Sequence, residues 1–270
     1  MPPLATGLFV RAWGAGEPLV LLHGSAPGDR EAMWARYRRA LADRYRLLVP
    51  DRRGYGASPG GTPGDLDAEV ADLLAVVGDG AHLVGFSYGG LLALLAAARR
   101  PGAIRSLTVI EPPAFAVARG HPAVDRVSAA LADLYDAAPA LAPEAFSRAF
   151  GRIWGDERGE PPALTPERRR ATARMMAERD PATIAVPLAA LAAAPFPKLV
   201  LAGGWAAAFE VVCDALARGI GAERASVPGA GHGVRDPALV THLAAFLNRS
   251  ADETRMVSCV RHVVLTWASV

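Results

Sequence analysis

A chain of 270 residues, of which 51% are hydrophobic and 21% charged, is long and apolar enough to bury a core, so the composition excludes an intrinsically disordered protein. The formal net charge is +2, and the basic residues are scattered among acidic ones. That distribution argues against a nucleic-acid-binding protein.

The cysteines and the N-terminal segment help to predict the cellular compartment of the protein. Cys213 and Cys259 lie far apart, and their spacing predicts neither a disulfide framework nor a zinc site. The segment Met1–Arg11 lacks the basic and apolar regions of a secretion signal, and no apolar run reaches the roughly 18 residues that a membrane-spanning helix needs. We therefore expect a cytoplasmic protein that is not attached to a membrane.

The first half of the chain alternates apolar runs with helical patterns. Uniform apolar character predicts strands that are buried on both faces, at Leu19–Leu22, Tyr45–Val49, His82–Gly85 and Ser106–Ile110. The segments between them predict helices over Glu31–Asp43, Asp65–Val77 and Tyr88–Arg100. Alternation of this kind predicts an α/β fold with a mostly parallel central sheet flanked by helices.

The second half opens with a long stretch that lacks strand signals. From Phe115 to about Pro195, alanine, leucine and arginine recur at helical spacing between prolines, which predicts an all-helical insertion. The alternation then resumes, with strands at Lys198–Ala202 and Ala225–Val227 and helices at Phe209–Arg218 and Pro237–Asn248. The stretch after Ser250 does not continue this pattern, and it is compatible with an extra strand or a disordered tail.

A GxSxG motif joins one predicted strand to the following helix. Gly85 and Gly89 flank Ser87 at this turn, where small neighbours allow the strand and the helix to approach closely. Such a turn exposes the serine hydroxyl and aims the amides of the next helix at it. We therefore interpret Ser87 as a nucleophile, although a short pattern of this kind also occurs by chance in glycine-rich turns.

With this motif in its strand and helix context, the sequence resembles the α/β-hydrolase superfamily over about Val10–Asn248. The resemblance implies a parallel sheet with helices on both sides and a helical cap inserted after the sixth strand. It divides the chain into a core formed by residues 1–114 and 196–250, a cap at residues 115–195, and a tail at residues 251–270.

The resemblance also guides the search for the base and the oxyanion hole. His232 lies in a glycine-flanked loop after the last predicted core strand, which is similar to the family's histidine loop. His23-Gly24 resembles the family's HG loop, and we expect the backbone amides of Ser25 and Tyr88 to form the oxyanion hole. We interpret the remaining histidines as structural or solvated: His23, His82, His121, His242 and His262.

The sequence departs from the family at the acid of the triad. The family usually places an aspartate in a GxxD arrangement, and the matching position here holds Ala206. Glu111 ends the strand after the nucleophile helix, so we expect it to replace that acid and to orient the imidazole. The alternative is that Glu111 only anchors the turn at Pro112-Pro113. Glu210 and Asp214 are weaker candidates because they fall on the predicted helix after the loop.

Together these residues predict a serine hydrolase that acts through an acyl-enzyme on a carboxylic ester or lactone of a small hydrophobic or aromatic molecule. No sequence site for a metal or an organic cofactor is found. The cap is rich in alanine and leucine and favours an apolar pocket. Its aromatic side chains either line that pocket or pack the cap onto the core: Phe115, Phe146, Phe150 and Trp154.

Two other functions remain open. The loop from His23 to Gly28 is similar to that of the carbon-carbon hydrolases that cleave aromatic ring-fission products, but those enzymes carry an aspartate where this chain has Ala206. A non-hydrolytic cyclase or a ligand receptor on the same fold is the other alternative. The expected partner is a small-molecule substrate and not a nucleic acid, and the sequence leaves open whether the chain forms a homo-oligomer.

Overall fold

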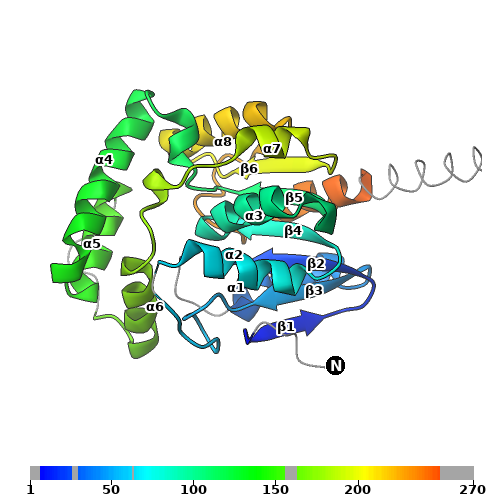
Figure 1. Ribbon diagram of the computed structural model, residues 1–270, viewed down its shortest axis with the longest axis horizontal. Coiled ribbons are helices and arrows are strands. Elements are labelled where there is room, and N and C mark those ends of the chain that lie inside the picture. Colours follow the sequence, from blue (N-terminus) through cyan, green and yellow to red (C-terminus); the bar gives the residue numbers. More distant parts are fainter. Residues whose placement is uncertain (1–6, 26–29, 63, 156–162, 250–270) are drawn as a thin grey trace, which may run out of the picture.

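A seven-stranded sheet forms the centre of the protein, with strand order β1-β3-β2-β4-β5-β6-β7. The computed structural model describes residues 7–25, 30–62, 64–155 and 163–249 (Figure 1). The tail at 251–270 lies outside the described residues. Every neighbouring pair of strands is parallel except β1 and β3, which are antiparallel. This confirms the predicted mostly parallel sheet.

The strands agree closely with the apolar runs of the sequence. They are β1 (Val10–Trp13), β2 (Glu17–Leu22), β3 (Tyr45–Pro50), β4 (Ala81–Phe86), β5 (Ile104–Ile110), β6 (Lys198–Ala202) and β7 (Glu223–Ser226). All residues of β4 and β6 are buried, as expected for strands that helices cover on both faces. The sequence analysis did not predict β1, a partly exposed strand at the sheet edge.

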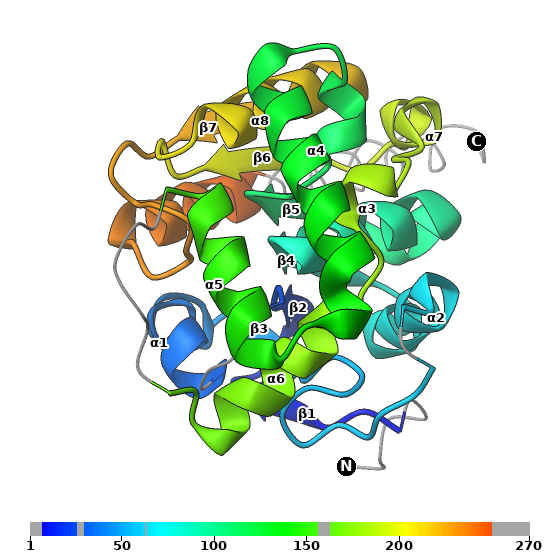
Figure 2. The same ribbon diagram turned by 90° about the vertical axis from the view of Figure 1, so that its left-hand side faces the viewer.

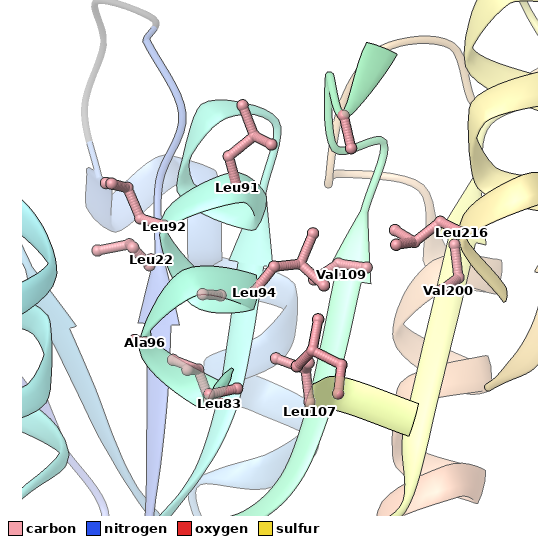
Figure 3. Close-up of a cluster of buried hydrophobic side chains, with 14 of the residues drawn as sticks. Leu22, Leu83, Leu91, Leu92, Leu94, Ala96, Leu107, Val109, Val200 and Leu216 are labelled. Atoms are coloured by element: carbon pink, nitrogen blue, oxygen red, sulfur yellow. The ribbon is translucent and has the colours of Figure 1, made fainter. Parts of the chain in front are cut away.

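Helices cover both faces of the sheet. On one face α2 (Leu66–Val77), α3 (Tyr88–Arg99) and α8 (Ala207–Ile220) pack against the strands. Figure 3 shows Leu92 of α3 beside Leu22 of β2, and Leu94 of α3 beside Val109 of β5, in this cluster. On the other face α1 (Arg30–Leu41) and a helix at residues 237–249 bury Trp34, Leu243 and Phe246. The helices thereby cover both faces of the sheet, and the loops extend from the ends of its strands.

The predicted insertion between β5 and β6 is helical throughout its described part. It contains α4 (Pro122–Ala137), α5 (Pro143–Ile153), α6 (Pro166–Met176) and the short α7 (Leu188–Ala193). The first three begin at a proline, whose missing N–H needs no partner in the first turn of a helix. Figure 2 shows α4 and α5 lying across the strand ends. This cap follows β5, which is the fifth strand in the described part of the chain. The resemblance implied a cap after the sixth strand.

A buried ionic network joins the cap to the core. The guanidinium of Arg52 contacts Glu69 on α2 at 2.6 Å and Glu178 of the insertion at 2.7 Å. Arg174 on α6 contacts the other oxygen of Glu69 at 2.7 Å, and the Tyr55 hydroxyl donates to Glu178. Burial raises the pKa of the Glu178 carboxyl above its ordinary value, and Arg52 opposes that rise. Removing one member would therefore leave an uncompensated charge in the interior.

None of the helices in the described part of the chain is long and apolar enough to cross a membrane.

Candidate active site

The turn between β4 and α3 holds Ser87 in a strained backbone conformation. Its φ is +52° and its ψ −128°, a region that side chains disfavour. The two motif glycines are required by packing. A Cβ at Gly85 would lie 2.4 Å from the Gly89 carbonyl oxygen, and a Cβ at Gly89 would lie 2.4 Å from the His23 carbonyl oxygen. The motif thus forms the sharp strand-to-helix turn that the sequence predicted.

His232 lies in the loop after β7 and contacts both predicted partners. Its Nε2 is 3.0 Å from the Ser87 Oγ, and its Nδ1 is 2.9 Å from Oε2 of Glu111. An ionised carboxylate only accepts hydrogen bonds, so Nδ1 carries the hydrogen and Nε2 is free to accept from the serine hydroxyl. The structure therefore brings together three side chains that are widely separated in the sequence, in the order serine, histidine, glutamate.

Glu111 follows β5 directly and is completely buried. Its φ is +49°, and a positive φ, which Ser87 also has, is unusual for a residue other than glycine. The Gly203 N–H donates to its Oε1 at 2.6 Å, and the Trp205 indole N–H donates to its Oε2. These contacts go beyond the alternative in which Glu111 only anchors the turn into the cap.

The other carboxylate candidates point to different partners. Ala206 stands immediately before α8, where it supplies no acid. Glu210 accepts from the Gly204 N–H and contacts Arg224, and Asp214 also contacts Arg224. Both therefore belong to an ionic cluster at α8 and β7, as their helical placement in the sequence suggested.

The predicted HG loop runs directly against Ser87, the predicted nucleophile. A Cβ at Gly24 would lie 2.7 Å from the Cβ of Ser87. His23 is buried, its Nε2 accepts from the Arg52 N–H at 2.9 Å, and its Nδ1 lies 2.7 Å from the Gly24 carbonyl oxygen. Burial, with the nearby positive charges of Arg30 and Arg52, holds the pKa of His23 well below its ordinary value. A neutral His23 thus holds the loop in place.

The two predicted oxyanion donors lie on either side of this approach. Ser25 follows Gly24, and Tyr88 is the first residue of α3, next to Ser87. A hydrogen bond from the Ser25 side chain reaches Glu178, so the buried ionic network extends to this loop. Residues 26–29, which complete the loop, lie outside the described residues. The role of the two amides stays a prediction.

Aromatic rings surround the imidazole. Phe86, Trp205 and Phe209 have their ring centres 5.0, 5.5 and 4.9 Å from that of His232. From the cap, Trp154 packs on Trp205 at 5.6 Å. Aromatic rings therefore form much of the surroundings of the imidazole.

The four cap aromatics serve two purposes. Phe115 and Trp154 reach Phe209 and extend the aromatic wall of the site. Phe146 and Phe150 stack on each other within a small core of the cap, and Phe150 also packs on Trp154 at 6.0 Å. Beside the wall lies a cavity of about 410 Å³, lined mainly by alanines and other apolar side chains of α4, the end of α5 and the start of α8, with Arg126, Trp154, Trp205 and Ala206 among them.

The remaining histidines have other roles. His82 is buried and bonds Ser106 and Glu17, and burial lowers its pKa. His121 caps the N-terminus of α4, and His242 is exposed on the helix at 237–249. His262 lies outside the described residues. Sequence reasoning missed the contact of Trp205 with Glu111, for which its place beside the vacant aspartate position was the only signal.

Comparison with known proteins identifies the relatives of this chain. A pimeloyl-[acyl-carrier protein] methyl ester esterase of Methylococcus capsulatus is 36% identical over 123 residues, which are 45% of this chain and 48% of that protein. A 2-hydroxy-6-oxo-2,4-heptadienoate hydrolase of Pseudomonas putida is 36% identical over 106 residues, 36% of this chain and 38% of that protein. The matched regions thus span half or less of these curated relatives.

Structural similarity extends over nearly the whole chain. The crystal structure of an alpha/beta hydrolase from Sphaerobacter thermophilus matches with a TM-score of 0.66 and 28% identity, over 89% of this chain and 96% of that one. The model of the alpha/beta hydrolase family matches residues 19–245. With the nucleophile turn, the sheet order and this match in agreement, the chain belongs to the alpha/beta hydrolase family.

Proposed function

We propose that this protein is a serine hydrolase that cleaves a carboxylic ester or lactone of a small hydrophobic or aromatic molecule. The observation that carries the proposal is the unbroken chain of contacts from the Ser87 hydroxyl through His232 to the buried Glu111. A base within hydrogen-bond reach of a hydroxyl, oriented in turn by an acid, is the arrangement that activates a serine nucleophile.

The reaction proceeds in two steps. His232 takes the Ser87 proton as the Oγ attacks the carbonyl carbon, and the amides of Ser25 and Tyr88 stabilise the oxyanion. Collapse of this intermediate breaks the ester bond and transfers the proton to the departing alkoxide, which leaves an acyl-enzyme. Water, deprotonated by His232, then attacks the acyl carbon. The second tetrahedral intermediate then collapses, which releases the carboxylic acid and returns the proton from His232 to the Ser87 Oγ.

The surroundings of His232 support an apolar substrate. Three aromatic rings lie within 5.5 Å of the imidazole, measured between ring centres. The cavity beside these rings is lined mainly by apolar side chains, with Arg126 among them, and ligand sites are mostly apolar. One relative is named a methyl ester esterase, which agrees with ester cleavage.

Hydrolysis of chromogenic esters tests the proposal. The panel includes short, medium-chain and aromatic acyl groups, and the wild type is compared with Ser87→Ala and with Ser226→Ala, a serine that lies on β7 next to Glu210. We expect activity in the wild type and in Ser226→Ala and none in Ser87→Ala. A folded wild type that hydrolyses no ester would contradict the proposal.

A carbon-carbon hydrolase of the ring-fission-product type is a second candidate. It is favoured by the relative named 2-hydroxy-6-oxo-2,4-heptadienoate hydrolase and by the loop that begins at His23. Cleavage of a ring-fission product without cleavage of any ester would support it. Slow single turnover with retention of the ligand would instead favour a receptor.

A further inference from the structure

The loop after β6 carries a tryptophan beside the position where the family's acid would stand. Gly203, Gly204, Trp205 and Ala206 connect β6 to α8, and none of them has a carboxylate. The loop nevertheless reaches the triad, because it donates two N–H groups to Glu111. The loop that lacks the family's aspartate thus contacts Glu111, the residue that we expect to replace that aspartate.

The Glu111 carboxylate accepts hydrogen bonds from these two N–H groups and from the imidazole. Oε1 accepts from the Gly203 N–H at 2.6 Å, and Oε2 accepts from both the Trp205 indole and the His232 Nδ1. A buried carboxylate without hydrogen bonds is strongly disfavoured, so its orientation follows its donors. Oε2 is shared by the indole and the imidazole. The direction of the indole N–H therefore determines where the oxygen that faces His232 can lie.

The loop itself is fixed against the histidine loop. A Cβ at Gly203 would lie 2.0 Å from the Gly231 carbonyl oxygen, so only glycine allows this approach. The Gly231 N–H also donates to the Gly203 carbonyl oxygen at 3.2 Å. The loop that carries Trp205 therefore bonds to the loop that carries His232, and its Gly203 N–H bonds to Glu111.

Three rings pack around the indole of Trp205. Its centre lies 5.6 Å from that of Trp154, from the cap, and 5.8 Å from that of Phe209 on α8. The imidazole of His232 lies at 5.5 Å. Contact with three rings restricts rotation of the indole, and its N–H has a defined direction.

From these contacts we propose that Trp205 is a positioning residue. Its indole N–H holds the Glu111 carboxylate in the orientation that accepts the His232 Nδ1 hydrogen. The inference rests on the proposed function, since it assigns a support to the same triad. The alternative is that Trp205 only packs between the cap and the core.

Trp205→Phe separates the two roles, because phenylalanine keeps an aromatic ring and lacks the N–H. Trp13→Phe is the matched control, since it makes the same change of side chain on β1, at the sheet edge and outside the site. With the carboxylate less firmly held, the imidazolium is less stabilised. We expect kcat of Trp205→Phe to fall about tenfold with KM unchanged, and Trp13→Phe to stay within about twofold.

The NMR signal of the His232 Nδ1 hydrogen gives a readout that does not depend on any substrate, because its position reports the hydrogen bond from Nδ1 to Glu111. We expect the signal to move to higher field in Trp205→Phe, as the hydrogen bond to a less firmly held carboxylate weakens. The same substitution in a Glu111→Gln background should have no effect, because Trp205 acts through that carboxylate. A signal that does not move, that moves to lower field, or that moves equally in Trp13→Phe would overturn the inference.

The two proposals fail in different ways. A wild type without ester hydrolysis contradicts the proposed function, whereas the signal of the Nδ1 hydrogen still tests the contact of Trp205 with Glu111. Full ester hydrolysis in Trp205→Phe with an unmoved signal contradicts only the positioning role.

Discussion

Substitution of Glu111 by glutamine is the sharpest test of the acid. In the protein, three N–H groups converge on its carboxylate, from Gly203, Trp205 and His232. Glutamine offers one oxygen and one NH2 group, so at least one of these donors would meet another donor. If the NH2 group faces the imidazole, Nδ1 must become the acceptor and the hydrogen moves to Nε2.

That tautomer cannot take the proton of Ser87, whose Oγ lies 3.0 Å from Nε2. The loss expected for such a reversal is about 10⁴-fold in kcat, the magnitude seen when a triad acid becomes its amide. The assay is steady-state hydrolysis of the best chromogenic ester at neutral pH, with thermal unfolding as a check on folding.

Glu210→Gln is the matched control, because Glu210 also accepts a backbone N–H from the loop after β6, while its side chain contacts Arg224 and Ser226. We expect it to keep nearly full activity. A Glu111→Gln variant that retained more than about a tenth of the wild-type kcat would refute the reasoning, because the imidazole would then not need the carboxylate.

Three further predictions follow from the fold. Arg52→Met should lower the free energy of unfolding by about 3–5 kcal/mol in urea titrations, because it removes the cation that contacts the buried Glu178 and leaves Glu69 with Arg174 alone; a loss under about 1 kcal/mol would contradict the buried network. Burial holds the pKa of His23 well below its ordinary value of 6.5, so the unfolded chain binds the proton more readily. Stability should therefore decrease as the pH falls below about 6.5, and His23→Gln should flatten that slope below about pH 6.5 in the same titrations. Ala206→Leu narrows the cavity of about 410 Å³ beside Trp205 and should raise KM for long-chain esters about tenfold while short-chain esters are unaffected, whereas Ala190→Leu on α7 should change neither.

Much of this architecture could be predicted because its signals are local. The run from Ala81 to Phe86 is buried along its whole length, and Tyr88 opens a helix that ends just before Pro101. Both features are written in consecutive residues, and so is the serine between them. β1 escaped prediction because Val10–Trp13 is only four residues long, includes Arg11 and lies at the partly exposed sheet edge.

The site was harder to predict where it depends on distant contacts. Glu111 could be proposed from its place at the end of a strand, since the family supplied a rule for that position. No such rule pointed to the indole of Trp205, which meets a carboxylate 94 positions away. Arg52 and Glu178, 126 positions apart, likewise carry no mutual signal in the sequence. Contacts of this kind depend on how the loops pack, and composition and periodicity do not encode that packing.

The backbone of Ser87 has a consequence for attempts to stabilise this protein. A serine at φ +52° and ψ −128° adopts a conformation that glycine tolerates far better, at a cost on the order of 1–3 kcal/mol. Its side chain is the proposed nucleophile, so relief of the strain and loss of activity would occur in the same substitution. Variant libraries selected for thermal tolerance alone would therefore accumulate glycine at this position and enrich inert proteins. Selection for stability in this fold should be coupled to turnover in every round.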